Sequence, residues 1–143
     1  MKIAVTGASG FIGRHVAAEL QRRDLQATLV SRRHVEAACR GTPHKWTQID
    51  ISVPPDDPFV AMGAPDLMIH LAWSGLPNYR SLHHHIESEL PNQYRFLSQL
   101  VRCGLKRMVI AGTCFEYGMR SGPLSEDMPA RPDNPYGFAV QTA

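Results

Sequence analysis

The sequence predicts an α/β fold with a doubly wound parallel sheet, because short apolar runs alternate with helical patterns along its 143 residues. The first run, residues 2–6, ends at glycines and leads into a helical pattern over residues 11–22. Short apolar runs of this kind are typical of parallel strands buried on both faces. Right-handed crossovers between such strands place helices on both faces of one sheet.

The rest of the chain continues this alternation. We expect four further strands, at residues 27–30, 46–49, 67–72 and 107–111. A short helix is expected at 34–40, and a long helical stretch at 82–103, which Pro91 either kinks or restarts. Tyr136 begins a helix that stops almost at once. Proline-rich segments predict loops, the first with at most one short helix, at residues 52–65 and 118–135.

Composition and charge argue against several classes of function. The net charge of +2 is too small to favour nucleic acid or a membrane surface as a partner. The apolar runs are far shorter than the ~20 residues of a membrane span, and no signal-peptide pattern precedes the first strand. The three widely spaced cysteines, Cys39, Cys103 and Cys114, indicate free thiols in a reducing compartment. We therefore expect a cytoplasmic protein that binds neither nucleic acid nor membranes.

Three consecutive histidines at residues 83–85 raise the question of a metal site. They fall within a helical pattern, where consecutive side chains point in different directions. We therefore expect no metal site in this chain.

Three glycines stand between the first strand and the first helix, at positions 7, 10 and 13. At this spacing, the first permits a tight turn, the second lets the backbone approach a pyrophosphate, and the third allows close packing of helix on strand. Free N–H groups and the positive end of the helix then bind the phosphates. A glycine turn without a ligand is the alternative. We assign the dinucleotide turn to Gly7, Ser9, Gly10, Phe11, Ile12 and Gly13.

The end of the second strand favours NADP over NAD. An acidic residue there would hydrogen-bond the ribose 2′-hydroxyl of NAD, but the chain has Ser31, Arg32 and Arg33. Guanidinium groups pair with a 2′-phosphate and can stack on adenine. Two solvated surface arginines are the alternative. Asp50, followed by Ile51, is placed to meet the adenine amino group, although a plain loop aspartate would have the same spacing.

Five motifs occur in order, namely TGASGFIG at 6–13, DI at 50–51, HLAW at 70–73, GTCFEYG at 112–118 and NPYGFA at 134–139. Their order and spacing resemble the extended short-chain dehydrogenase/reductase family, the NAD(P)-dependent epimerases and dehydratases of nucleotide sugars. The resemblance covers the whole chain and implies a Rossmann-like cofactor domain with a nucleotide-sugar substrate. It also implies that the cofactor is lined by Leu71, Ala72 and Trp73.

The resemblance implies a catalytic pair. Tyr136 would exchange a proton with a sugar hydroxyl or keto oxygen while a hydride moves to or from the nicotinamide, and Thr113 would hydrogen-bond the same oxygen. Cys114 and Phe115 stand where the family's dehydratases have an Asp-Glu pair, which disfavours dehydration. The segments GTCFEYG at 112–118, LSEDM at 124–128 and LPNQYRFL at 90–97 look most like those of reductases and epimerases of 4-keto-6-deoxy sugar nucleotides in surface-polysaccharide synthesis. A preference for NADP favours reduction.

One position departs from the family pattern. Val140 stands four residues after Tyr136, where the family has a lysine. Such a lysine lowers the tyrosine pKa from its ordinary value of ~10 and holds the ribose, and valine can do neither. The resemblance also covers only the first half of such an enzyme. We therefore expect residues 1–143 to form an incomplete cofactor domain, with the C-terminal substrate domain absent and weak or no catalysis.

Two further expectations follow. Apolar surface left uncovered in such a half should make the chain a homo-oligomer, because large apolar patches are rarely left exposed. The valine also keeps a second reading open, a non-catalytic NAD(P)-binding or sensor module. A non-functional gene remnant is a third.

Overall fold

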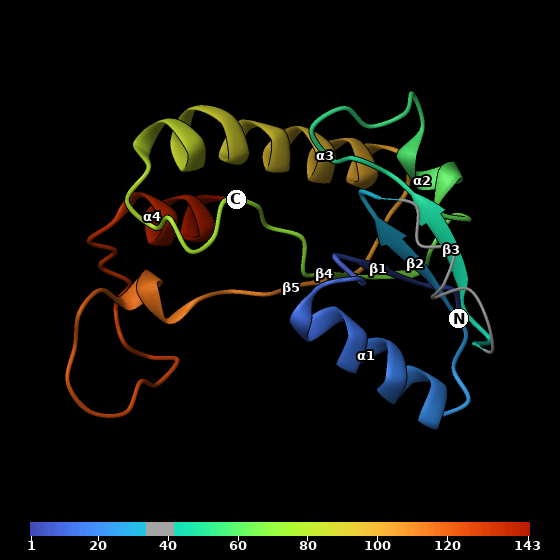
Figure 1. Ribbon diagram of the computed structural model, residues 1–143, viewed down its shortest axis with the longest axis horizontal. Helices are drawn as coiled ribbons and strands as arrows, with labels where there is room; N and C mark the ends of the chain where they lie inside the picture. The colour runs from blue at the N-terminus through green and yellow to red at the C-terminus, as the bar shows by residue number, and fades with distance from the viewer. Residues whose placement is uncertain (34–41) are drawn as a thin grey trace. The chain divides into compact units, whose positions relative to one another are not determined.

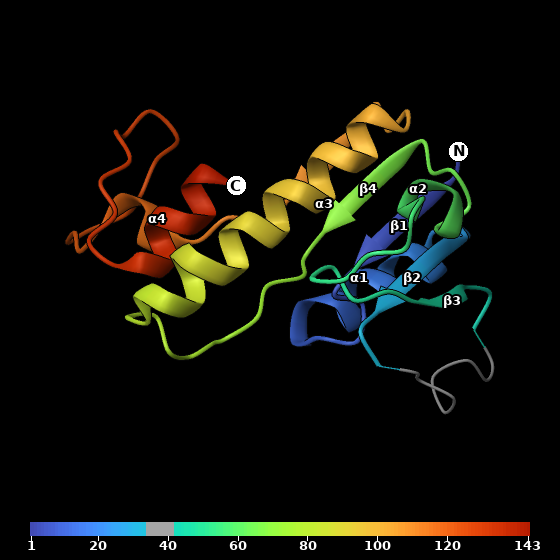
Figure 2. The ribbon, with the colours of Figure 1, turned by 90° about the horizontal axis from the view of Figure 1, so that it is seen from above.

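The structure is a computed structural model that describes residues 1–33 and 42–143, so the helix expected at 34–40 and Cys39 lie outside the described residues. The chain divides into two compact units. The first comprises Met1–Ala72 and Phe96–Ala111, and the second comprises Trp73–Arg95 and Gly112–Ala143. Figures 1 and 2 show the elements of both units.

The first unit is built on a five-stranded sheet of order β3–β2–β1–β4–β5, in which all neighbouring strands are parallel. β1 lies in the centre of the sheet, β2 and then β3 lie on one side of it, and β4 and then β5 lie on the other. The predicted doubly wound fold is therefore confirmed, and ligands of such sheets bind at the carboxyl ends of the strands where the order reverses. The strands are β1 (Ile3–Thr6), β2 (Ala27–Ser31), β3 (Lys45–Gln48), β4 (Leu67–His70) and β5 (Met108–Ile110).

Helices cover both faces of this sheet, as alternation of side chains along each strand requires (Figure 1). On one face, α1 (Phe11–Arg22) packs its Leu20 with Ile3 and Val5 of β1. On the other face, Ala4 of β1 belongs to a core that also contains Phe96, Leu97 and Leu100 of α3 (Leu90–Arg102) and residues of and next to α2 (Pro58–Ala61). The first unit thus has two apolar cores, one on each side of the sheet.

The long helical stretch contains a change of helix type before Pro91. A π-helix, η2 (His83–Glu89), precedes α3, which begins at Leu90. The backbone stays helical through Leu90, and Pro91 is the second residue of α3, directly after the wider π turns of η2. Of the two expectations for Pro91, the start of a new α-helix is the one that the structure has.

The second unit contains η2, the first residues of α3, the 3₁₀-helix η3 (Cys114–Tyr117) and α4 (Pro135–Thr142). The sequence did not predict η3, and α4 is longer than expected. The Asn134 side chain caps α4 by accepting a hydrogen bond from the Gly137 N–H at 2.9 Å, and Pro135 occupies the first turn. Together these residues fix where α4 begins and bring Tyr136 into its first turn.

Candidate functional site

The glycine turn of the first unit requires glycine for steric reasons. Gly7 has a φ of 67°, and a Cβ on it would lie 2.8 Å from the carbonyl carbon of Leu71. A Cβ on Gly13 would lie 2.2 Å from the carbonyl oxygen of Gly7. By contrast, a Cβ on Gly10 would meet only that same oxygen, at 3.1 Å. The turn is therefore packed tightly against the end of β4 and the start of α1, while Gly10 leaves its outer side open.

The start of α1 fits an anion. Gly10 is the N-cap residue, no side chain caps the helix, and no acidic residue lies in its first turn. Ser9 is exposed, as are Phe11 and Ile12, at 74% and 55%. Uncapped N–H groups at the positive end of a helix bind phosphates, so these residues fit the pyrophosphate of a dinucleotide.

The carboxyl ends of β2 and β3 bring together the residues predicted to contact the adenosine. Ser31 is buried and its hydroxyl donates to the Arg33 carbonyl, while both arginine side chains are exposed. The Ser52 hydroxyl and N–H donate to Asp50 at 2.7 and 2.9 Å. These bonds, with the nearby charge of Arg32, hold the pKa of Asp50 below its usual value. The exposed Arg32 and Arg33 therefore lie near the ionised carboxylate of Asp50. Ile51, the next residue, packs against the core.

The predicted cofactor residues fall into both units. The glycine turn, Ser31 to Arg33, Asp50, Ile51, Leu71 and Ala72 belong to the first unit, where the backbone of Leu71 and Ala72 lies against Gly7. Trp73 belongs to the second unit and packs there against Tyr136, with ring centroids 5.7 Å apart. The structure therefore gives Trp73 a role beside the predicted catalytic tyrosine.

The second unit brings the predicted catalytic pair together. Tyr136 is 8% exposed, and its hydroxyl shares a hydrogen bond with the Thr113 side chain. Thr113 is held by a capping box, in which its Oγ1 accepts from the Phe115 N–H at 3.4 Å and its own N–H donates to Glu116 at 2.6 Å. The Thr113 hydroxyl is thus fixed in position by η3.

Four rings pack around the Tyr136 ring and form an aromatic cage. Their centroids lie 5.3 to 6.1 Å from that of Tyr136, and they belong to Trp73, Tyr79, His85 and Phe115. The Tyr136 N–H also donates to the Tyr79 carbonyl at 3.2 Å. The sequence did not indicate that Tyr79 or His85 would lie beside Tyr136. The four ring positions have no common spacing that would have identified them.

The surroundings of Tyr136 favour its neutral form. Burial raises the pKa of Tyr136 above its ordinary value, and the Thr113 hydrogen bond offsets only part of that rise. The Tyr79 phenol and the Glu116 carboxylate raise this pKa further. Within the described residues, the groups that act on this pKa include no cation, and Val140 stands one turn further along α4. Tyr136 is therefore a neutral phenol at neutral pH and can donate its proton.

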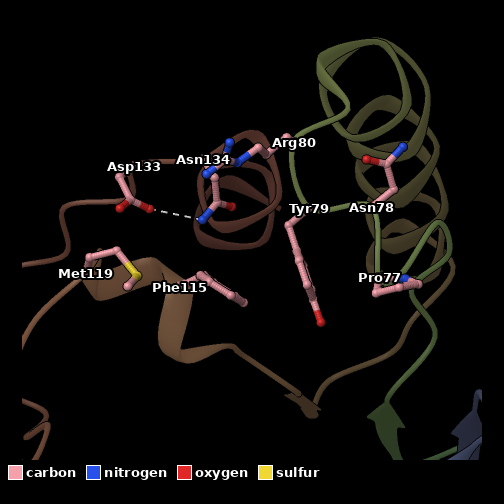
Figure 3. A pocket seen from close by; sticks show the side chains of 8 residues that line it. All are labelled: Pro77, Asn78, Tyr79, Arg80, Phe115, Met119, Asp133 and Asn134. Atoms are coloured by element: carbon pink, nitrogen blue, oxygen red, sulfur yellow. Dashed lines mark hydrogen bonds between the residues drawn. The ribbon is translucent and has the colours of Figure 1, made fainter.

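A pocket of about 380 Å³ lies within the second unit. Figure 3 shows Tyr79 and Phe115 beside each other at its wall, with their ring centroids 4.8 Å apart. Asn134 donates to Asp133 at 3.0 Å on another side. Pro77, Asn78, Arg80 and Met119 complete the lining. Aromatic faces beside amide, carboxylate and guanidinium groups suit a polar, hydroxyl-rich ligand.

The three consecutive histidines have separate partners. His83 pairs with Glu87 at 2.8 Å, His84 lies 3.1 Å from the Ser74 hydroxyl, and His85 is fully buried in the aromatic cage. Within residues 1–33 and 42–143, no three His, Cys, Asp or Glu side chains form a group that could hold a metal ion. None of the helices that the structure describes is long and apolar enough to cross a membrane.

Comparison with known proteins agrees with this geometry. Residues 3–143 match the NAD dependent epimerase/dehydratase family. The chain is 30% identical over 141 residues to a dTDP-6-deoxy-L-talose 4-dehydrogenase (NAD(+)) of Aggregatibacter actinomycetemcomitans, covering 97% of this chain and 51% of that protein. It is 28% identical to a putative UDP-arabinose 4-epimerase of Arabidopsis thaliana, covering 99% of this chain and 36% of that one.

Among solved structures, the chain is similar to MoeE5 in complex with UDP-glucose and NAD, with a TM-score of 0.79 and 27% identity. That similarity covers 99% of this chain and 46% of MoeE5. The chain thus spans about half the length of the first relatives that it matches, or less. The glycine turn, the doubly wound sheet and the match over residues 3–143 lead to one conclusion, that this chain belongs to the NAD dependent epimerase/dehydratase family.

Proposed function

We propose that this chain is the cofactor-binding half of an NADP-dependent reductase or epimerase that acts on 4-keto-6-deoxy sugar nucleotides. The observation that carries the proposal is the glycine turn, where a side chain on Gly7 or Gly13 would collide with backbone and where the start of α1 is uncapped. The relatives support the substrate class, since one is named for dTDP-6-deoxy-L-talose and MoeE5 was solved with UDP-glucose.

The preference for NADP rests on Arg32 and Arg33. Both are exposed at the end of β2, and guanidinium groups suit a 2′-phosphate. The talose dehydrogenase is named for NAD, and MoeE5 was solved with NAD. The two arginines are thus the feature on which we base a different cofactor preference for this chain.

The dinucleotide, when bound, supplies or accepts the hydride. The chain's own contribution is the proton: Tyr136 is a buried neutral phenol, suited to give its proton to a keto oxygen as that oxygen becomes a hydroxyl. Thr113, fixed by its capping box, would orient the same oxygen. The pocket beside Tyr79 and Phe115 is the place we assign to the sugar.

A titration of NADP and NAD against the purified chain tests the cofactor assignment. We expect tighter binding of NADP, and we expect Arg32→Ala and Arg33→Ala to weaken NADP more than NAD. Arg23→Ala is the matched control, because Arg23 lies just past the other end of α1 and pairs with Glu19. Equal affinities of the unchanged protein for both dinucleotides would remove the NADP assignment, and binding of neither would remove the proposed function.

A second candidate is a non-catalytic dinucleotide-binding module. Val140 favours it, because no cation stands one turn beyond Tyr136 to bring the phenol toward ionisation. The discriminating measurement is NADPH oxidation with a dTDP-4-keto-6-deoxyhexose. Turnover that Tyr136→Phe abolishes supports the enzyme, whereas dinucleotide binding without turnover supports the module.

We also propose that the chain is a cytoplasmic homo-oligomer. On β5, which is an edge strand of the sheet, Val109 and Ile110 are 58% and 42% exposed. Apolar side chains exposed on a sheet favour association. Light scattering across a concentration series tests this, and a monomer at every concentration would contradict it.

A further inference from the structure

His85 is a buried histidine whose two ring nitrogens both have partners. The Trp73 indole N–H donates to Nδ1 at 3.3 Å, and Nε2 lies 2.9 Å from the Asn78 carbonyl oxygen. An indole N–H can only donate and a carbonyl can only accept. These partners therefore assign the ring as neutral, with its proton on Nε2.

The segment from Trp73 to Asn78 is held by η2 through two side chains on one face of that helix. His85 binds both ends of the segment, at Trp73 and Asn78. Glu89, four residues later, accepts from the Ser74 hydroxyl at 2.6 Å and from its N–H at 3.2 Å. Residues four apart on a helix are neighbours, so His85 and Glu89 act on the segment side by side.

The same segment supplies part of the aromatic cage. The Trp73 ring stacks on His85, with centroids 6.4 Å apart and planes 27° apart, and both rings face Tyr136. Tyr79 follows directly after Asn78, and its carbonyl accepts the Tyr136 N–H. A substitution at His85 therefore affects Tyr136 directly, through the contact between their rings, and indirectly through Trp73 and Tyr79.

We propose that His85 is a positioning residue for Tyr136, a neutral imidazole that ties Trp73 to Asn78 and so holds the rings of the aromatic cage in place around the Tyr136 ring. The inference rests on the proposed function in that Tyr136 is taken as the proton donor. It assigns His85 no contact with the substrate. Its role differs from that of a space-filling core histidine, because it depends on one acceptor and one donor in fixed places.

Three variants test the proposal. His85→Phe keeps a ring but removes both hydrogen bonds, whereas His85→Gln offers one acceptor and one donor again. His83→Phe is the matched control, since the His83 side chain is 85% exposed and pairs only with Glu87 among the described contacts. Each variant is also combined with Tyr136→Phe, so that the difference in tyrosinate absorbance on alkaline titration isolates Tyr136.

Two readouts are measured on each folded variant. One is hydrogen exchange of the Trp73 indole proton by NMR, assigned with Trp46→Phe because the chain has two tryptophans. The other is the ionisation midpoint of Tyr136. In His85→Phe we expect indole exchange at least tenfold faster and a Tyr136 midpoint that falls toward the ordinary value of ~10. In His85→Gln we expect both to return toward the values of the unchanged protein, and in His83→Phe we expect no change.

A folded His85→Phe protein with both readouts unchanged would overturn the proposal. So would a His85→Gln protein that behaves like His85→Phe, since ring shape rather than hydrogen bonding would then matter. If His85→Phe does not fold, Trp73→Phe breaks the same bond from its other end, and an unchanged Tyr136 midpoint there would overturn the proposal. Dinucleotide binding is scored separately: its absence from the unchanged protein counts against the proposed function and leaves the His85 result standing.

Discussion

A Cβ on Gly13 would lie 2.2 Å from the carbonyl oxygen of Gly7 and 2.6 Å from the Cα of Ala8. No real Cβ comes this close to backbone, and neither contact can be relieved by turning a side chain. The first turn of α1 is therefore pressed directly onto the turn that follows β1. This contact places the uncapped N–H groups of α1 at the carboxyl end of the central strand, where a doubly wound sheet binds its ligand.

Gly13→Ala should destabilise the chain, because α1 must shift away from the turn. Overpacking of this kind costs about 1–3 kcal/mol and occasionally more. Gly10→Ala is the matched control, since its Cβ would meet only one atom at 3.1 Å. We expect urea denaturation to show a much smaller loss for Gly10→Ala, with dinucleotide binding weakened in both variants. Equal stability losses in the two variants would contradict this account of the turn.

The glycine turn and the sheet could be predicted because their signals are local. Gly7 and Gly13 are needed because a Cβ at either position would collide with backbone, and every strand except β3 is mostly apolar. The expected bounds of α1 were those that the structure has. The strand order β3–β2–β1–β4–β5 is a finding of the structure, because the crossover rule fixes the handedness of each connection and leaves the order open.

The aromatic cage could not be predicted because it has no local signal. Its rings come from a loop, a π-helix and a 3₁₀-helix, and they meet Tyr136 of α4 only in the folded second unit. Trp73 was assigned to the cofactor through the family resemblance, and the structure packs its ring against Tyr136. The four-residue spacing of His85 and Glu89 places these two polar side chains side by side on a helix. This spacing was the only local feature of the sequence that connected any of these residues.

Val140→Lys should lower the pKa of Tyr136. The two residues are four apart on α4, so they share a face, and an ammonium group there would favour the phenolate. We expect the ionisation midpoint of Tyr136 to fall by about one pH unit or more, measured by tyrosinate absorbance against the Tyr136→Phe counterpart. Gln141→Lys adds the same charge at the next, exposed position and should leave the midpoint nearly unchanged. If both lysines had the same effect, a general change of net charge would explain it.

Tyr136 should also make stability depend on pH in the alkaline range. Its pKa is raised in the folded chain, so the folded state holds the phenolic proton more tightly than the unfolded state does. The resulting stabilisation is fully present below the unfolded pKa of about 10 and is lost as pH rises through the higher folded value. Urea denaturation from about pH 8 to 11.5 should therefore show a shallower decline for Tyr136→Phe than for the unchanged protein. Parallel declines would mean that the environment of Tyr136 does not favour the neutral phenol.

Glu87 and Glu89 lie two residues apart on η2 and should respond very differently to the same substitution. Glu87 is exposed and pairs with His83, whereas Glu89 is 6% exposed and accepts hydrogen bonds from Ser74 and from the Gln93 amide at 2.9 Å. In Glu89→Gln, an amide donor would face donors that now bind a carboxylate. Hydrogen bonds to a buried charge contribute about 1.5–3 kcal/mol each, so we expect a loss in that range or above.

Glu87→Gln removes only an exposed pair, for which the expected loss is below about 1 kcal/mol. Urea denaturation at neutral pH measures the stability of both variants. Ser74→Ala should reproduce part of the stability loss of Glu89→Gln, because it removes the shortest hydrogen bond to Glu89. Combining Ser74→Ala with Glu89→Gln should then cost less than the sum of the two single losses, since both act on one contact. Additive losses, or similar losses for Glu87→Gln and Glu89→Gln, would show that Glu89 does not hold the segment that follows Trp73.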